Sequence, residues 1–332
     1  MPSHPKVFVD DQPQKTLLCV ESVRILDLFC GIGGVAEATR GWQSNGDTSA
    51  AARVVAAIDI DRRLVSIYQT NHGIRPRVGA IESLTASSQI FSTEEKESVD
   101  MWWLSPPCQP YTQRGNQLAE DDPRSAGLER ILELLRSIRP KFLGLENVPA
   151  FEGSRHHRLL QQTLESAGYN IRTFRLCPTE WAVPMRRNRF YLLAARDQKL
   201  SRELRRQSVQ GRLQDHLRAS AWEDHQLHVG TAQLKRYSNA MKILDADDHS
   251  AVASCFTSAY GSSPVRAGSY LRCRERNIVR RFAPDEIASL MGFRSQFAWS
   301  ADLDLRAKYR LIGNSLAIPV VRDLLRMTVA HS

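Results

Sequence analysis

Several features that would assign a chain to a class of proteins at once are missing from this sequence. Among its 332 residues, no uninterrupted apolar run approaches the roughly 18 residues of a membrane helix, and the longest aliphatic runs, such as 54–58, are short. The N-terminal segment has no basic start followed by an apolar stretch, so we expect no secretory signal. These absences argue against a membrane protein or a collagen-like chain and predict a cytoplasmic protein.

Cysteine is scarce and scattered. The sequence has six cysteines, none in a CxxC pair or in a cluster with histidine at metal-ligand spacing, so we expect no bound metal. Without an export signal, the thiols should stay reduced. At most one or two of them should carry chemistry, and the others should be small core residues.

Positive charge is in excess, and it is unevenly distributed. The net charge is +9: residues 1–110 contribute −3, residues 111–195 +4, residues 196–281 +7 and residues 282–332 +1. The excess is mostly arginine, whose planar guanidinium suits phosphate groups and base edges. A basic chain can simply be soluble, and single arginines can lie on a solvated surface. The dense run from 272 to 281 is harder to explain in that way and favours a polyanionic partner.

Short apolar segments alternate with helical periodicity along most of the chain. This alternation predicts an α/β protein with a doubly wound, mostly parallel sheet, in which ligands bind beyond the carboxyl ends of the strands. The segments expected to be strands are 23–29, 54–60, 99–105, 141–147 and 189–195, and those expected to be helices include 127–138, 157–168 and 283–293.

Residues 197–281 interrupt this alternation. They are polar, rich in arginine and serine, and show no clear strand pattern, so we expect an inserted, smaller target-recognition region there. Residues 23–196 and 282–332 then form a catalytic and cofactor-binding domain. Residues 1–22, which are polar and proline-rich, form a loose extension.

The motif LDLFCGIGG (26–34) places three glycines between an expected strand and an expected helix. Glycines there let the backbone approach a ligand at a helix start, although the pattern is neither GxGxxG nor a Walker loop and also suits a plain tight turn. Asp59 ends the next strand, where a carboxylate can accept hydrogen bonds from ribose hydroxyls. Together the two features indicate a nucleoside-containing cofactor.

The motif SPPCQPYTQRG (105–115) holds Cys108 on a loop stiffened by three prolines, directly after an expected strand. A thiol in fixed geometry at that place suits a nucleophile better than a structural cysteine in a turn.

Two further motifs supply candidate catalytic groups. In LENV (145–148), Glu146 follows an apolar run, so partial desolvation should raise its pKa toward proton-donor duty, although a strand-end ion pair is the alternative. In VPMRRNRFYLL (183–193), Arg187 and Arg189 alternate and so share one face. Two guanidiniums on one face can orient an anion or a carbonyl, and a basic strand edge is the alternative.

With GNS (313–315), which alone reads as a helix cap, these motifs resemble in order and spacing those of the cytosine-5 nucleic-acid methyltransferases, over residues 23–330. The resemblance implies a Rossmann-like fold that uses S-adenosyl-L-methionine. It implies catalytic roles for Cys108, Glu146, Arg187 and Arg189: covalent attack at C6 of cytosine, proton donation at N3, and orientation of the base. It implies cofactor contacts from Phe29, Gly31, Ile32, Gly33, Gly34, Asp59, Ile60, Ile81 and Asn314.

A finer resemblance lies in SCFTSAYGS (254–262), which is similar to the branch that methylates an anticodon-loop cytosine of tRNA. It implies that this segment contacts the nucleic acid, and we expect the nearby basic run to contribute as well. The expected nucleic-acid contacts are Gln109, Cys255, Phe256, Thr257, Tyr260, Arg272, Arg274 and Arg276. Met185 departs from the glutamine that usually begins the family's RxR motif. The tRNA branch also tends to lose that glutamine, so the departure fits.

The expected partner is therefore a nucleic acid, tRNA favoured over DNA, with no membrane, no metal and a monomeric chain. One alternative is a DNA cytosine-5 methyltransferase, which could belong to a modification system. Another is a nucleic-acid-binding protein that has lost catalysis, against which the presence of both Cys108 and Glu146 argues.

Overall fold

The structure, a computed structural model, describes most of the chain. The described residues are 22–40, 52–92, 99–111, 122–197, 199–200, 203–207 and 209–328. The predicted N-terminal extension lies outside them, apart from residue 22.

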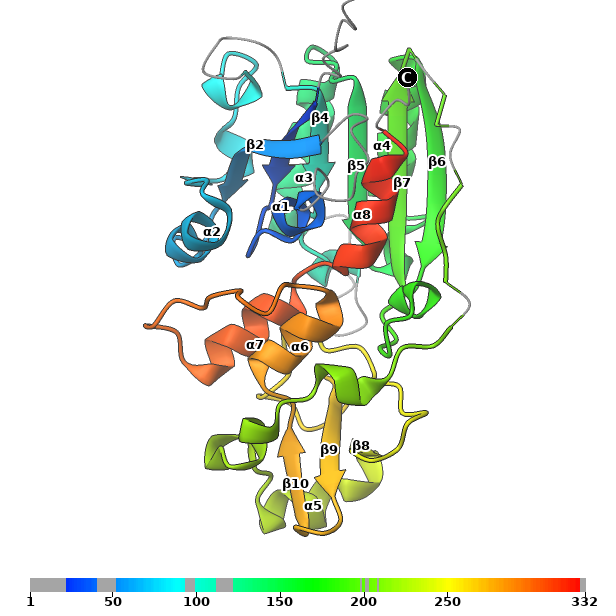
Figure 1. The fold of residues 1–332 in the computed structure, drawn as a ribbon. Coiled ribbons are helices and arrows are strands. Elements are labelled where there is room, and N and C mark those ends of the chain that lie inside the picture. Colours follow the sequence, from blue (N-terminus) through cyan, green and yellow to red (C-terminus); the bar gives the residue numbers. More distant parts are fainter. Residues whose placement is uncertain are drawn as a thin grey trace, which may run out of the picture.

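A seven-stranded sheet forms the larger part of the molecule (Figure 1). Its strand order is β3-β2-β1-β4-β5-β7-β6, and every neighbouring pair is parallel except those that involve β7, which runs antiparallel to both β5 and β6. The strands are β1 (Val23–Leu28), β2 (Ala52–Asp59), β3 (Arg77–Val78), β4 (Met101–Leu104), β5 (Phe142–Asn147), β6 (Tyr169–Leu176) and β7 (Arg189–Arg196).

Helices cover both faces of this sheet, because its central strands are apolar on both sides. One apolar cluster packs α1, α2 and α8 on one face, and a second packs α3 and α4 on the other. This confirms the predicted doubly wound α/β architecture. The helices are α1 (Gly34–Thr39), α2 (Leu64–His72), α3 (Ala126–Leu135), α4 (Arg155–Ser166) and α8 (Ile318–Arg326).

A second, three-stranded sheet lies below the large one in Figure 1, within the region where no strand pattern was expected. The prediction missed it because its strands are only four or five residues long, too short for an alternating pattern to stand out. Its order is β10-β9-β8, with α5 nearby and α6 and α7 between the two sheets. These elements are α5 (Thr231–Tyr237), β8 (Lys242–Asp245), β9 (Ser269–Cys273), β10 (Ile278–Arg281), α6 (Pro284–Met291) and α7 (Leu305–Gly313).

The two sheets share one apolar cluster. Val35 of α1, Leu324 of α8, Ile287 of α6 and Leu271 of β9 all belong to it, so the small sheet has no separate core among the described residues. The chain returns to the large sheet through α8, which packs against α1. The last helix thereby brings the α7–α8 turn to the carboxyl ends of the strands, and this placement builds the site.

None of the helices in the described residues combines the length and the hydropathy that a membrane crossing requires.

Candidate active site

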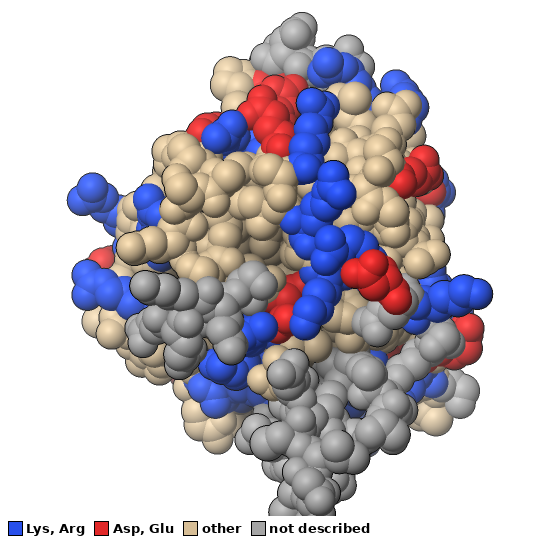
Figure 2. Space-filling model, turned by 90° about the horizontal axis from the view of Figure 1, so that it is seen from above, with Lys and Arg blue, Asp and Glu red and all other residues tan. Residues whose placement is uncertain are grey.

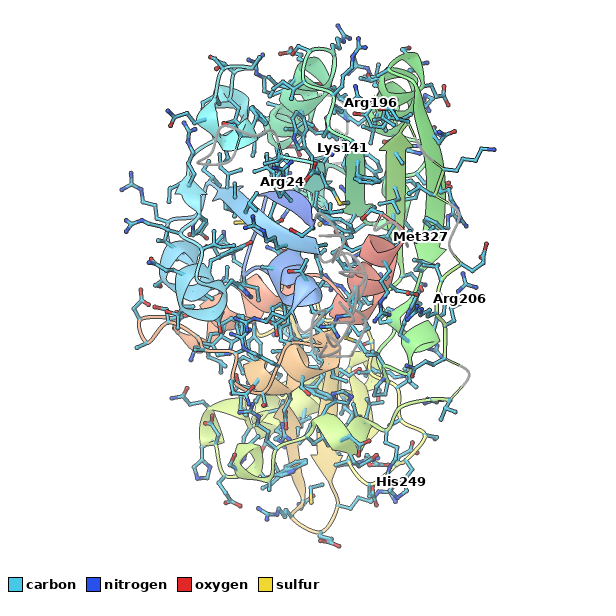
Figure 3. All side chains as sticks on the ribbon, turned by 45° about the horizontal axis from the view of Figure 1, so that its top comes forward. Arg24, Lys141, Arg196, Arg206, His249 and Met327 are labelled. Carbon is cyan, nitrogen blue, oxygen red and sulfur yellow. The ribbon has the colours of Figure 1, made fainter. Side chains whose placement is uncertain are left out.

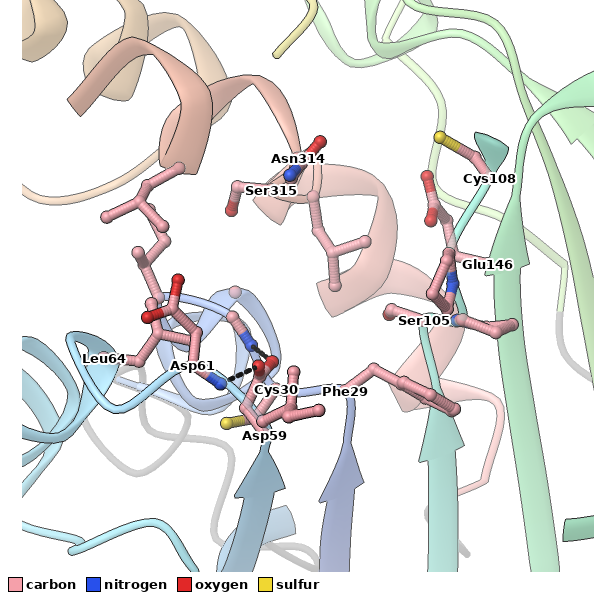
Figure 4. A pocket seen from close by; sticks show the side chains of 18 of the residues that line it. Phe29, Cys30, Asp59, Asp61, Leu64, Ser105, Cys108, Glu146, Asn314 and Ser315 are labelled. Atoms are coloured by element: carbon pink, nitrogen blue, oxygen red, sulfur yellow. Dashed lines mark hydrogen bonds between the residues drawn. The ribbon is translucent and has the colours of Figure 1, made fainter. Parts of the chain in front are cut away.

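A cavity of about 560 Å³ opens where β1, β2, β4 and β5 end and the α7–α8 turn begins (Figure 4). Ligands in doubly wound sheets bind at this edge. Its wall contains most of the residues that the motifs singled out, namely Phe29, Gly31, Ile32, Gly34, Asp59, Ile60, Ile81, Cys108, Gln109, Glu146, Arg187, Arg189 and Asn314.

The glycine loop after β1 uses its glycines in different ways. Gly31 has φ +54, and a Cβ there would point into open space, so the backbone itself faces the cavity. Gly34 packs against Leu316 of the α7–α8 turn, with its Cβ position 3.0 Å from that side chain.

Gly33 is not among the residues that line the cavity, and its cofactor contact stays a prediction. It has φ +88, and a Cβ there would lie 2.3 Å from Nε2 of His72 in α2. Its role is to let the loop pack on α2, so it supports the site from behind.

Asp59, at the end of β2, fixes this loop. One carboxylate oxygen accepts a hydrogen bond from the Gly31 N–H at 3.0 Å and the other accepts one from the Asp61 N–H, also at 3.0 Å. Burial raises the pKa of Asp59, and these backbone donors lower it in part. Ile60 follows with its side chain 72% exposed, and Ile81 is buried, so the cavity has one open and one closed apolar wall here.

Cys108 lies on the proline loop that follows β4. Asn147, at the end of β5, holds the loop by donating from Nδ2 to the carbonyl of Pro106 at 3.3 Å. Burial and the neighbouring Glu146 carboxylate raise the pKa of the Cys108 thiol, and Arg189 and Arg187 lower it in part. The rest of the motif, residues 112–115, lies outside the described residues.

Glu146 lies beside Cys108 on the same wall of the cavity (Figure 4). Its carboxylate pairs with Nε of Arg189 at 3.1 Å. Burial raises the pKa of Glu146, and Arg189 and Arg187 offset part of this rise. A carboxyl group with a raised pKa, next to a thiol, can donate a proton while the thiolate attacks.

Arg187 lines the cavity and also makes a structural tie. Its side chain is buried, and its guanidinium donates to the carbonyl oxygens of Phe256, Gly313 and Ser315. It therefore ties the α7–α8 turn to the segment before β9, and its role in orienting the base stays a prediction. Met185, two residues earlier, is fully buried in the shared apolar cluster and does not line the cavity.

Cys255 lies against the same two arginines. Its Sγ is 3.5 Å from Nη1 of Arg187 and 3.7 Å from Nη2 of Arg189. It does not line the cavity wall, so it reaches the site through the arginines.

Two of the predicted nucleic-acid contacts are core residues. Phe256 is 0% and Tyr260 1% exposed, and their rings pack edge-to-face at 5.0 Å. Tyr260 also packs on Tyr309 of α7 at 4.8 Å. This burial corrects the expectation that their side chains touch the target: they join the small sheet to α7. The backbone of Thr257 packs closely on Gly313. A Cβ at position 313 would lie 2.3 Å from the carbonyl carbon of Thr257.

The three predicted basic contacts lie on the β9–β10 hairpin, at the end of the small sheet away from the cavity (Figure 1). Arg272 and Arg274 both pair with Asp245 of β8, and Arg276 pairs with Glu223. All three are substantially exposed, so they are available to a partner once these pairs open.

Positive charge also gathers at the opposite end of the molecule. Figure 2 shows a band of basic side chains across the face at the amino ends of the large sheet. Arg24, Lys141 and Arg196 lie at this end (Figure 3). Arg24 and Lys141 share Asp100, so part of this charge is neutralised.

The site contains charged and polar residues that the motifs did not predict. Among them, Arg124, Arg310, Glu82 and Asp61 line the cavity, and Asn147 anchors the Cys108 loop. The ENV motif contains Asn147 and could have indicated it. The four charged residues belong to no motif, and only the folded chain brings them to the cavity.

The described residues contain no group of three or more His, Cys, Asp or Glu side chains that could hold a metal ion.

Comparison with known proteins assigns this arrangement to a family. Residues 23–329 match the family model described as C-5 cytosine-specific DNA methylase. A tRNA (cytosine(38)-C(5))-methyltransferase of Schizosaccharomyces pombe is 30% identical over 94% of this chain and 98% of its own. A DNA (cytosine-5)-methyltransferase of Dictyostelium discoideum is 26% identical over 94% of this chain and 95% of its own.

A solved structure of a methyltransferase from Entamoeba histolytica superimposes with a TM-score of 0.80 at 25% identity, covering 92% of this chain and 98% of that one. The chain therefore belongs to the C-5 cytosine-specific DNA methylase family and is a cytosine-5 methyltransferase.

Proposed function

We propose that this cytosine-5 methyltransferase uses S-adenosyl-L-methionine to methylate an anticodon-loop cytosine of tRNA, through a covalent bond between Cys108 and C6 of the base. The observation that carries the proposal is the meeting of Cys108, Glu146 and Arg189 on one side of a cavity whose other side is the glycine loop and Asp59. A nucleophile, a proton donor and a nucleoside pocket are thus joined in one space.

The residues around the glycine loop fit S-adenosylmethionine. The open space above Gly31 admits a ligand against the backbone, and Asp59 has lone pairs left for ribose hydroxyls. Ile60 and Ile81 offer apolar surface to the adenine. When bound, the cofactor supplies the methyl group as an electrophile.

The chemistry of the base falls to Cys108 and Glu146. The Cys108 thiolate forms a bond to C6, the C5–C6 electron pair moves toward C5, and Glu146 gives its proton to N3. C5 would then take the methyl group, with S-adenosylhomocysteine as the leaving group. As a water molecule takes the C5 proton, the C5–H electron pair restores the C5–C6 double bond, the sulfur departs as thiolate, and N3 returns its proton to Glu146.

Target choice is supported by the fission-yeast relative's name and by the cost of exposing the base. A cytosine must leave its stack to reach Cys108, and this costs less in a single-stranded loop than in a duplex. We assign residues 197–281 to target recognition, with the Cys255–Tyr260 segment as its inner support and the β9–β10 hairpin as its outer, basic end.

The test offers labelled S-adenosylmethionine, total tRNA and duplex DNA side by side to the purified protein. Label should enter tRNA, and Cys108→Ala should abolish transfer. Full transfer by Cys108→Ala would refute the mechanism. Ser166→Ala, at the exposed end of α4 and outside the cavity, is the control and should keep its activity.

DNA methylation is the second candidate, favoured by the Dictyostelium relative's name. Label that enters only DNA would select it. Trapping on 5-fluorocytosine-containing RNA or DNA separates both from a binding protein without catalysis, which would form no Cys108-dependent adduct.

A further inference from the structure

The Cys255 thiol lies between the two guanidiniums of the RxR motif. Nη1 of Arg187 and Nη2 of Arg189 both direct hydrogen bonds at its Sγ, over 3.5 and 3.7 Å. The Sγ also lies 3.7 Å from the carbonyl oxygen of Phe256, to which only the protonated thiol can donate. These lengths are within the normal range for bonds to sulfur. One sulfur atom therefore connects the arginine that pairs with Glu146 to the arginine that holds the α7–α8 turn.

Positive charge around Cys255 exceeds negative charge unless the Cys255 thiol is ionised. Arg187 is buried and Arg189 is 13% exposed at the cavity wall, and the other side-chain hydrogen bonds of Arg187 end on neutral carbonyl oxygens. Among the described residues, the carboxylate that pairs with these arginines is that of Glu146, which faces Arg189. Two largely desolvated guanidiniums against one carboxylate leave a positive charge uncompensated, which is costly away from water.

The remaining titratable neighbours do not supply the missing charge. Burial raises the pKa of Tyr191, so its phenol stays neutral. Burial and Glu146 also raise the pKa of Cys108, which ionises only for catalysis. The Sγ of Cys177 accepts a hydrogen bond from the backbone N–H of Arg187 at 3.4 Å, and not from its guanidinium.

We propose that Cys255 is a thiolate that serves as the second counter-charge of the RxR pair and thereby holds Arg189 on Glu146. It is a positioning residue, since it acts on the reaction only through the arginines. This inference rests on the proposed function of Cys108 and Glu146. Burial alone would raise the pKa of Cys255, but the charges and hydrogen bonds of Arg187 and Arg189 outweigh burial and lower it.

The thiolate has a consequence for proton donation. Arg189 and Arg187 lower the pKa of Glu146, and a negative charge beside them weakens that effect. Replacing the thiolate by a neutral group should therefore lower the pKa of Glu146. Because Glu146 donates only while protonated, the loss of donation with rising pH should then occur at lower pH.

The first experiment measures the charge directly and needs no activity. The thiolate absorbs in the ultraviolet, so the difference between the parent chain and Cys255→Ser, followed against pH, reports the ionisation of this one residue. Its midpoint should lie below the ordinary pKa of a free cysteine thiol, about 8.5. A midpoint at or above that value would overturn the proposal.

The second experiment follows kcat/KM for methyl transfer against pH. In Cys255→Ser, the bend that reports Glu146 should move toward acid by about one pH unit, because a tenfold change in proton affinity is one unit. A purely structural role would lower the profile by one factor at every pH without moving the bend, and that result would refute the inference.

The two readouts also separate the two proposals. If the parent chain transfers no methyl group to tRNA or DNA, the proposed function fails, and the thiolate titration still decides the charge of Cys255.

Discussion

The two arginines of the RxR motif have different surroundings in the folded chain. Arg189 pairs with Glu146, whereas the guanidinium of Arg187 donates hydrogen bonds to three backbone carbonyls from two distant segments. Its removal would leave those buried acceptors unpaired. At the scale of single residues, Arg187 is therefore a stabilising tie, and Arg189 is the member that pairs with the carboxyl group proposed as proton donor.

We expect Arg187→Met to lose about 3 kcal/mol of unfolding free energy, the usual cost of unpairing a buried charged network. Urea unfolding followed by circular dichroism measures this loss. Arg186→Met is the control, because Arg186 is its exposed neighbour and should change stability by less than about 0.5 kcal/mol. Equal stability of the two variants would show that the carbonyl contacts of Arg187 carry no weight.

At the scale of elements, the β1–α1 loop separates two uses of glycine. Gly31 and Gly33 both have positive φ, but Gly31 faces the cavity and Gly33 faces α2. The same substitution should therefore have different effects two residues apart.

Gly31→Ala should weaken binding of S-adenosylmethionine with a modest loss of stability, because its methyl group enters the space meant for the ligand. Gly33→Ala should lower Tm more, since its Cβ would overlap His72. Calorimetric binding and thermal unfolding separate the two effects. Gly73→Ala, at the open end of α2 with φ +73, is the control for strain without a ligand contact. If Gly31→Ala binds as the parent does, the loop does not hold the cofactor.

The β9–β10 hairpin gives an element-scale prediction for the target. Arg274→Gln with Arg276→Gln should weaken tRNA binding and lower the slope of log affinity against log salt by about 0.7 per lost contact to a single strand. Filter binding across a salt series measures both quantities. Asp245→Asn is the opposite control: it frees Arg272 and Arg274 from their ion pair and should strengthen binding. Unchanged affinity in both variants would make the hairpin an ordinary solvated surface.

At the scale of the whole molecule, features that follow from a local sequence pattern could be predicted. Features that depend on contacts between distant segments could not. The parallel strands that end at Asp59 and Glu146 were visible as apolar runs, so the edge that carries the site could be predicted. The small sheet could not, because its strands are short. The ties of Arg187 to Gly313 and Ser315 cross more than 120 residues of sequence, and the packing of Phe256 on Phe282 crosses 26, so no local pattern encodes them.

The cavity joins the two ends of the catalytic part of the chain, and this gives a prediction for the whole fold. Gly31 and Asp59 line it from the first strands, and Asn314 lines it from the last turn. A ligand bound there stabilises the folded state only, by about 2.7 kcal/mol at a hundred times its Kd. For a chain of this size we expect S-adenosylhomocysteine to raise Tm by about 5 °C.

The rise in Tm should shrink in Asp59→Asn, because the carboxylate that accepts from the Gly31 N–H is also the group that we propose for the ribose hydroxyls. It should persist in Glu152→Gln, whose carboxylate pairs with Arg175 outside the cavity. Thermal unfolding of the three chains with and without the ligand makes the comparison. Because the ligand would connect strands from the start of the chain to a turn near its end, the melt should remain a single transition. A rise confined to one of two transitions would show that the site belongs to one part of the fold and does not hold both ends together.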